Sequence, residues 1–365
     1  MALLYIAGFA VALLISLLST PWVKRFALKI GAVDAPNHRK VHTRIMPRLG
    51  GLAIFAAFAV ACVLFFPRVP GFNAHAALGL LAGGAVIVLV GALDDRFDLK
   101  PRLKLIGQIV AASIVVAFGL KVDLVNLPFG HSWSLMGWLS VLITIVWIVG
   151  VTNAINLIDG LDGLSAGVSA IATAAMLVLA LLMGNVTVAL LCAILLGSIG
   201  GFLFYNFHPA QIFMGDSGAL FLGFSLATLS ILGFKQATVV SFLVPVLILG
   251  VPLSDTFFAI VRRWVNKRPI SMPDKSHLHH CLLQLGFGHR TTVLIIYGIA
   301  AFFGICAVVL SQATTWGIVV LIALILLVME VGAEAIGIIG KSWKPVLHLL
   351  RKAKGLRVAK SRMPK

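Results

Sequence analysis

The chain has 365 residues, of which 60% are hydrophobic and 11% charged, and it carries a net charge of +17. Soluble domains contain about 25% charged residues, so this composition excludes an ordinary soluble globular protein. Strand barrels of the membrane would show alternating apolar and polar residues in segments of about ten, a pattern that the sequence lacks. The remaining fold class is an all-α, polytopic integral membrane protein.

Windows of roughly 20 apolar residues predict where the chain crosses the membrane. They predict about eleven transmembrane helices, at residues 2–20, 49–67, 76–93, 104–120, 135–152, 164–183, 185–204, 217–233, 238–260, 292–310 and 313–338. Most of the 29 Lys and Arg residues fall in every second loop and in the tail. The positive-inside rule therefore places the N-terminus outside and the C-terminus in the cytoplasm.

These boundaries predict one transmembrane domain over residues 1–340 and a basic cytoplasmic tail over 341–365. The predicted cytosolic loops are 21–48, 94–104, 153–163, 205–216 and 262–290. The positive charge lies beside the bilayer, where anionic headgroups attract it, so we expect membrane lipids and no nucleic acid as partners. The four cysteines show no CxxC spacing, so neither a disulfide framework nor a zinc site built on them is indicated.

The stretch from Asn153 to Leu164 places two amides and two carboxylates between uncharged apolar segments. Asn153, Asn156 and Asp159 recur every three residues, so a helix end would carry them on one face. Polar groups are costly at the edge of a bilayer, which makes these residues candidates for a functional site. A tight turn would need only one or two of them, so we favour the site.

Two adjacent carboxylates, Asp94 and Asp95, end the third apolar segment. They repel each other and dehydration adds to that cost, so a cation should hold them. Arg96, Lys100 and Lys104 could do so as a structural network. A divalent metal ion or a catalytic role is the alternative.

The stretch from Asn206 to Gly218 contains Asp216 just before the eighth apolar segment. An aspartate in that position commonly caps a helix. However, the third and fourth cytosolic loops contain no Lys or Arg, so we expect them to draw inward to one shared site. Gly215 and Gly218 would leave room there for a bulky ligand.

The last cytosolic loop carries three histidines within four residues, His277, His279 and His280, after a proline-rich turn. A zinc site would need them to converge with a further ligand, and at helical spacing His277 and His280 could converge while His279 would point elsewhere. Phosphate binding by imidazole donors fits the basic surroundings at least as well.

Together and in this order, four motifs resemble those of the polyprenyl-phosphate N-acetylhexosamine-1-phosphate transferases, glycosyltransferase family 4. They are DDxxD at 94–98, NxxNxxDGxDGL at 153–164, NFxPAxIFMGDSG at 206–218 and HxHH at 277–280. The histidine context resembles the branch that starts O-antigen, enterobacterial common antigen or teichoic acid linkage units. The peptidoglycan branch typically has three consecutive histidines, which Leu278 interrupts here.

The resemblance implies a Mg²⁺-dependent enzyme, with Mn²⁺ as a substitute, at the cytoplasmic face of the bacterial plasma (inner) membrane. It would transfer N-acetylhexosamine 1-phosphate, with GlcNAc as the expected sugar, from a UDP-sugar to undecaprenyl phosphate and release UMP. A homodimer is one assembly that the sequence leaves open. The resemblance implies catalytic roles for Asp94, Asp95, Asp159 and Asp162, metal binding by Asp216 and Asn156, and substrate binding by Lys40, Asn153, Asn206, Phe213, His277, His279 and His280.

Three other readings stay open at this point. A phospho-muramoyl-pentapeptide transferase of the peptidoglycan branch would keep the chemistry and change the substrate. An ion-coupled transporter would use acids inside the spans, such as Asp255, Glu330 and Glu334, but nearly all acids lie at one face and no repeat symmetry is evident. An intramembrane prenyltransferase would carry a second aspartate-rich motif in place of the amide-rich one.

Overall fold

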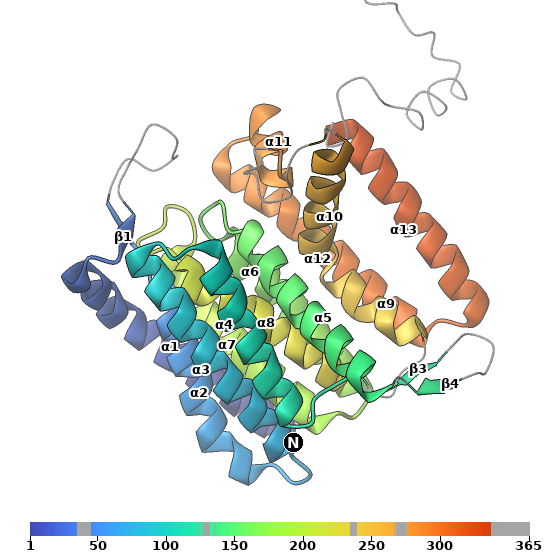
Figure 1. Ribbon diagram of the computed structural model, residues 1–365, viewed down its shortest axis with the longest axis horizontal. Coiled ribbons are helices and arrows are strands. Elements are labelled where there is room, and N and C mark those ends of the chain that lie inside the picture. The colour runs from blue at the N-terminus through green and yellow to red at the C-terminus, as the bar shows by residue number, and fades with distance from the viewer. Residues whose placement is uncertain are drawn as a thin grey trace, which may run out of the picture.

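The computed structural model describes residues 1–34, 45–122, 124–126, 132–134, 136–233, 239–265, 267 and 276–336, and these form a bundle of helices (Figure 1). The helices are α1 Ala2–Ile30, α2 Gly50–Phe65, α3 Ala74–Phe97, α4 Pro101–Ala117, α5 Gly137–Leu157, α6 Leu164–Leu182, α7 Val186–Asn206, α8 Gly215–Gly233, α9 Val239–Ile248, α10 Gly250–Val265, α11 Leu278–Gln284, α12 His289–Gln312 and α13 Thr315–Ile336.

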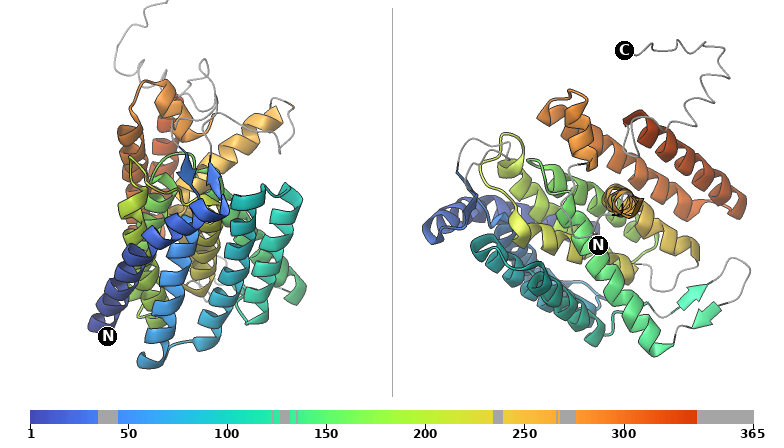
Figure 2. Two further views of the ribbon diagram at one scale, coloured as in Figure 1. Left: turned by 90° about the vertical axis from the view of Figure 1, so that its left-hand side faces the viewer. Right: turned by 45° about the horizontal axis from the view of Figure 1, so that its top comes forward.

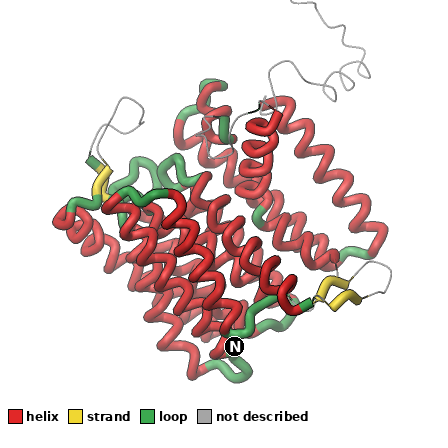
Figure 3. The backbone as a smooth tube through the Cα atoms, viewed as in Figure 1, coloured by secondary structure: helices red, strands yellow, loops and turns green. Residues whose placement is uncertain are grey.

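Only short stretches depart from helix, as the tube view shows (Figure 3). They are the 3₁₀ turn Phe66–Arg68 and two antiparallel pairs, β1 Val33–Asp34 with β2 Met46–Pro47 and β3 Leu124–Asn126 with β4 Ser132–Ser134. Eight of the described helices are long and apolar enough to cross a membrane. The predicted all-α, polytopic membrane fold is therefore confirmed, while the number of crossings and the sides of the termini stay predictions.

The ninth predicted span, residues 238–260, is two helices instead of one. Helix α9 ends at Ile248 and α10 starts at Gly250. Pro252 has no N–H to donate to the carbonyl of Ile248, and its ring crowds that carbonyl. The helix is therefore interrupted between Ile248 and Gly250. Helix α1, by contrast, continues through Pro21 to Ile30, beyond the predicted end of the first span, and stops at Gly31 in the left-handed conformation.

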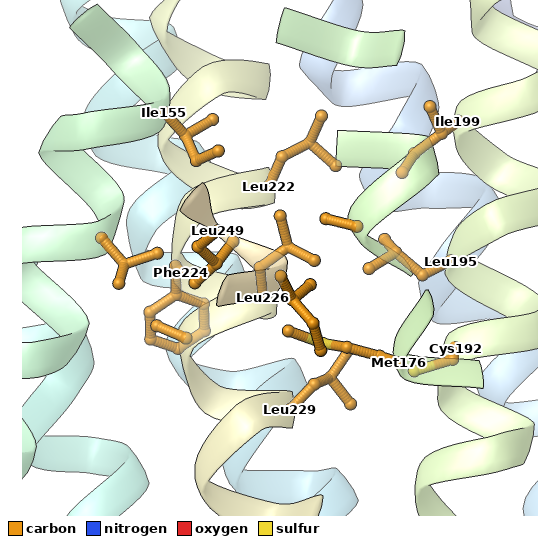
Figure 4. Close-up of a cluster of buried hydrophobic side chains, with 14 of the residues drawn as sticks. Ile155, Met176, Cys192, Leu195, Ile199, Leu222, Phe224, Leu226, Leu229 and Leu249 are labelled. Carbon is orange, nitrogen blue, oxygen red and sulfur yellow. The ribbon is translucent and has the colours of Figure 1, made fainter. Parts of the chain in front are cut away.

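Helix α8 lies at the centre of the bundle and contacts α2, α3, α5, α6 and α7. It is apolar on all sides, and nearly all of its residues from Gly215 to Ile231 are buried. A helix of this kind must be surrounded by other helices. Its side chains interlock with those of α5, α6 and α7, including Ile155, Met176, Cys192, Leu195, Leu222 and Leu226 (Figure 4).

Glycines let two helices, α2 and α3, approach the start of α8 closely. A Cβ on Gly51 of α2 would lie 2.0 Å from the backbone nitrogen of Gly218, and one on Gly91 of α3 would lie 2.5 Å from Cα of Ser217. Small residues at such crossings allow backbone contact, which is how helices associate within membranes. The crossing brings the end of α3, with its two aspartates, against the first turn of α8.

We expect Gly91→Ala to lower the melting temperature of the detergent-purified protein by several degrees. The added Cβ would meet backbone atoms, which cannot move aside as a flexible side chain can, and such overpacking costs about 1–3 kcal/mol. Gly150→Ala in α5 is the matched control, because nothing in the described part of the chain lies within 4 Å of its added Cβ. Equal melting temperatures for both variants would contradict the close crossing.

The polar segments gather at one end of the bundle. The loops after α3, α5 and α7 lie at the end that also carries β1 and α11, and the N-terminus lies at the opposite end (Figure 2, left). Helices α9 to α13 form a group that attaches to α5 and α6 through α9, α10 and α12. Motifs that are far apart in the sequence therefore meet on one face.

Candidate active site

Asp95 holds the start of α8. Its Oδ1 accepts a hydrogen bond from the backbone N–H of Asp216 at 2.8 Å, and its Oδ2 accepts one from that of Ser217 at 3.1 Å. The carboxylate thus satisfies N–H groups that a helix start leaves open, at the positive end of the helix dipole. Asp95, and not Asp216, is the cap of α8. The expectation that Gly215 and Gly218 leave room for a ligand is wrong, because Asp95, Met214 and helix α2 fill that space.

Lys104 of α4 joins two carboxylates from other helices. Its Nζ lies 3.0 Å from Oδ2 of Asp94 and also pairs with Oδ2 of Asp216. The side-chain amide of Asn156, at the end of α5, lies beside the carboxylate of Asp216. The side chains of the three charged residues are between 10% and 23% exposed, so a ligand in solution can reach them.

This cluster has the donors that a divalent cation requires. Asp94 and Asp216 supply carboxylate oxygens and Asn156 an amide oxygen, and hard cations such as Mg²⁺ prefer oxygen ligands. The ammonium group of Lys104 provides the positive charge between the two carboxylates, which would otherwise repel each other. The residues fit Mg²⁺, or Mn²⁺ in its place.

Asp159 lies in the loop after α5, near the same carboxylates. The residue as a whole is half-buried, but its carboxyl group is surrounded by protein. This desolvation, together with the negative charges of Asp216 and Asp95, raises the pKa of Asp159 to about 8, against the opposing effect of Arg48. In the metal-free protein Asp159 is therefore protonated at neutral pH.

This shift predicts a pH-dependent effect of Asp159→Asn. Between about pH 4 and pH 8 the folded, metal-free protein keeps the proton that the unfolded chain releases, so its stability falls as the pH rises through this window. With a chelator present, we expect the variant to match the wild-type melting temperature near pH 4 and to exceed it by several degrees near pH 9. A difference that does not change with pH would contradict the raised pKa.

Asn206 ties the third and fourth cytosolic loops together. Its Oδ1 accepts a hydrogen bond from the N–H of Gly163 at 3.1 Å, and its Nδ2 donates to the carbonyl of Ile212 at 3.0 Å. The hydroxyl of Tyr297 donates to the carbonyl of Gly163 at 2.5 Å. Because the Asn206 amide is occupied by backbone groups and is 4% exposed, we assign it to loop positioning instead of substrate contact.

Asp162 makes a second link between the same two loops. Its Oδ2 lies 2.8 Å from Nδ1 of His208 and accepts a hydrogen bond from the N–H of Ala210 at 3.1 Å. The third and fourth loops therefore do meet, as their lack of basic residues suggested. Both contacts of Asp162 are with protein groups, so Asp162 supports the site by holding the two loops together.

Asp255 of α10 orients the first histidine of the HxHH motif. Its Oδ2 lies 2.8 Å from Nδ1 of His277, and its Oδ1 accepts a hydrogen bond from the N–H of Leu278 at 2.8 Å. Both side chains are almost fully buried, at 3% and 7% exposure. A proton on Nδ1 that faces this carboxylate leaves Nε2 of His277 as the atom available for other contacts.

His279 packs against the third cytosolic loop. A Cβ on Gly160 would lie 2.5 Å from its Nε2, so the glycine makes the space for the imidazole. The rings of His277 and His280 lie 6.1 Å and 4.1 Å from that of His279, so the expectation that His279 points away from the other two is wrong. Burial and the neighbouring His280 lower the pKa of His279 to about 4, which keeps it neutral at pH 7.

Phe213 is positioned by the end of the first cytosolic loop. Its N–H donates to the carbonyl of Pro47 at 2.9 Å, and its carbonyl accepts from the N–H of Gly50 at 3.1 Å. Phe213 is half-buried. Lys40, the predicted basic contact in the first loop, lies outside the described residues.

Asn153 is one turn further inside the bundle than Asn156. Its Nδ2 donates to Oε1 of Gln108 at 2.6 Å and to the carbonyl of Val149 at 2.8 Å, and Nε2 of Gln108 donates back at 3.3 Å. This reciprocal amide pair joins α4 to α5. We therefore assign Asn153 to holding α4 and α5 together.

Several residues of the site had no motif to mark them. Of the three cations near the aspartate pair, Lys104 makes the ion pairs, and the other two are exposed. Asp255 stood out only as an acid within an apolar segment, which needs a partner, and the sequence did not identify His277 as that partner. His208 lies inside a motif at a variable position, and His289 stands alone at the start of α12, so neither gave a signal.

Comparisons with known proteins find one family profile, and several relatives that match most of the chain. Residues 77–234 match the glycosyl transferase family 4 profile. A Bacillus subtilis protein described as a probable undecaprenyl-phosphate N-acetylglucosaminyl 1-phosphate transferase is 48% identical over 93% of this chain and 94% of its own length. A decaprenyl-phosphate N-acetylglucosaminephosphotransferase of Mycolicibacterium smegmatis is 35% identical over 86% of the chain and 85% of its own. A Yersinia pestis undecaprenyl-phosphate alpha-N-acetylglucosaminyl 1-phosphate transferase is 28% identical over 89% of the chain and 88% of its own.

Proposed function

This chain is an enzyme of glycosyl transferase family 4, and we propose that it transfers N-acetylglucosamine 1-phosphate from UDP-GlcNAc to undecaprenyl phosphate and releases UMP. One observation carries the proposal. In a chain 48% identical to a relative named for this reaction, Asp94, Asp216, Asn156 and Lys104 converge from four helices into one partly exposed cluster. The contacts of that cluster suit a phosphoryl transfer between two anions.

The reaction exchanges one phosphoanhydride for another, so its main demand is to bring two anions together. Asp216, Asn156 and Asp94 would hold Mg²⁺, which would supply positive charge to the diphosphate oxygens of the donor. Lys104 would then turn its ammonium from the carboxylates to the phosphate of the acceptor. A phosphate monoester is largely ionised near neutral pH, so the attack needs no strong base. Asp95, with both oxygens bound to α8, positions Asp216.

The donor would lie between the fourth cytosolic loop and the histidine segment. The partly exposed ring of Phe213 is suited to stack on uracil. His277 and His280 would offer imidazole N–H groups to the phosphates or the sugar, with His277 oriented by Asp255. His279 is 3% exposed and neutral. We therefore propose that it packs against Gly160 and makes no charged contact with the phosphates.

The acceptor chain would lie among α10, α12 and α13. A cavity of about 350 Å³ opens there, lined mainly by apolar side chains such as Phe258, Phe302 and Phe303, with Asp255 in its wall. An apolar wall next to the histidine segment fits a polyprenyl chain whose phosphate faces the polar end of the bundle. We further propose that this end faces the cytoplasm of a bacterial plasma membrane and that the product starts a lipid-linked cell-envelope glycan.

A panel of UDP-sugars tests the proposal. Purified enzyme is given undecaprenyl phosphate, Mg²⁺ and one UDP-sugar at a time, and released UMP is measured. We expect turnover with UDP-GlcNAc and none with the muramoyl-pentapeptide nucleotide. Turnover with the muramoyl nucleotide alone would keep the reaction and replace the substrate, and no UMP from any N-acetylhexosamine would overturn the proposal.

A further inference from the structure

A second cluster of ligating side chains lies beside the proposed active site. Asp162 follows α5, His208 follows α7 and His289 begins α12. One ligating atom of each lies within 4.8 Å of those of the other two. The rings of the two histidines stack with their centres 4.2 Å apart and their planes 22° apart. Three segments that are distant in sequence thus bring two imidazoles and a carboxylate together.

The hydrogen bonds of this cluster leave a nitrogen without a partner. Nε2 of His289 is buried and makes no hydrogen bond within the described residues. The same imidazole also faces the backbone of Asp162, and metal-binding histidines commonly have such a partner at their other ring nitrogen. A buried acceptor without a donor is costly, and a cation at Nε2 would remove that cost.

The other two members of the cluster are already in ligand-like contact. Nδ1 of His208 lies 2.8 Å from Oδ2 of Asp162, so an imidazole nitrogen and a carboxylate oxygen already face each other. The guanidinium of Arg290 donates to the carbonyl of His208 at 3.2 Å, so the backbone that carries this histidine is held in place. The site is therefore assembled before any ion arrives.

We propose that Asp162, His208 and His289 bind one zinc-class transition-metal ion, separate from the Mg²⁺ at Asp216. Two nitrogens and one oxygen are the donor set that Zn²⁺ takes, whereas Mg²⁺ prefers oxygen alone. Three protein ligands leave a fourth position for water. The ion links the third loop, the fourth loop and the start of α12, and so stabilises the loops that carry Asp159 and Asn206.

Metal binding to the full-length protein tests this inference. The protein is purified in detergent without a polyhistidine tag, stripped with a chelator and titrated with Zn²⁺ while Mg²⁺ is kept in excess. We expect one tightly bound Zn²⁺, a higher melting temperature, and visible d–d absorption when Co²⁺ replaces Zn²⁺. The double variant His208→Asn with His289→Gln should weaken binding at least about 100-fold and lose the absorption.

Two single-histidine controls locate the site. His75→Gln, in the exposed first turn of α3, should bind Zn²⁺ as the wild type does. His280→Gln should also keep the site, so loss of binding in this variant alone would assign the ion to the HxHH segment and overturn the inference. Absence of Zn²⁺ binding by the wild type, or unchanged binding by the double variant, would overturn it too.

The outcome is independent of the proposed transferase reaction. Zn²⁺ affinity and Co²⁺ absorption are read without any sugar nucleotide, so they report on the cluster even if the substrate assignment fails. UMP release with Mg²⁺, in turn, reports on the cluster at Asp216 whether or not Zn²⁺ binds.

Discussion

Asp216→Asn is expected to lower the rate of UMP release by at least about 100-fold and to raise the Mg²⁺ concentration needed for half-maximal activity. The side chain of Asp216 contacts Lys104, Asp94 and Asn156, so it is the group that the other members of the cluster share. An amide at this position keeps the shape and removes the negative charge that would hold the cation. The measurement is UMP release as a function of Mg²⁺ concentration.

Asp98→Asn is the matched control for this variant. Asp98 ends the DDxxD motif, is exposed, and takes a left-handed backbone conformation that asparagine also adopts readily. We expect its activity to stay within about twofold of the wild type, as is usual for a surface position. Full activity and an unchanged Mg²⁺ requirement in Asp216→Asn would remove Asp216 from the metal site.

Lys104→Gln is expected to shift the Mg²⁺ requirement in the opposite direction. Removal of the ammonium leaves Asp94 and Asp216 without their cation, so Mg²⁺ should bind more tightly and half-maximal activity should need less of it. The maximal rate should nevertheless fall at least about 100-fold, because the transferred phosphoryl group loses a positive charge beside it. Without Mg²⁺, the variant should also melt at a lower temperature than the wild type.

Lys100→Gln and Lys104→Arg control for charge and position. Lys100 precedes α4 and is exposed, so its loss should change neither the rate nor the Mg²⁺ requirement. Arginine at position 104 keeps the charge and should restore part of the maximal rate. If Lys104→Gln raised the Mg²⁺ requirement as Asp216→Asn does, Lys104 would be acting as a structural support and not as a competing cation.

The sequence was sufficient to predict the helical membrane fold, because burial in a bilayer leaves a signal in each segment by itself. Each predicted span overlaps a helix, and only the ninth is divided. That interruption results from the hydrogen bond that Pro252 removes, and the apolar composition of the segment gives no sign of it. The role of Gly91 was likewise not visible in the sequence, because the need for a glycine there depends on the backbone of α8 that it faces.

The sequence predicted most of the carboxylate and amide residues of the candidate site, but not which of them contact one another. Motifs supplied Asp94, Asp216 and Asn156, which do meet in the structure. The use of both Asp95 oxygens as the cap of α8, and the pairing of Asp255 with His277, depend on contacts between helices far apart in sequence. Such contacts distinguish residues that hold the site from those that face a ligand.

The most direct test of the central claim is the stoichiometry of the two products. Purified enzyme in detergent is incubated with UDP-GlcNAc and undecaprenyl phosphate, and both UMP and the lipid-linked sugar diphosphate are quantified, with Mg²⁺ and with a chelator. We predict equal amounts of the two products with Mg²⁺, and neither with the chelator or with Asp216→Asn. UMP without the lipid product, or both products in the chelator, would contradict a Mg²⁺-dependent transfer at this cluster.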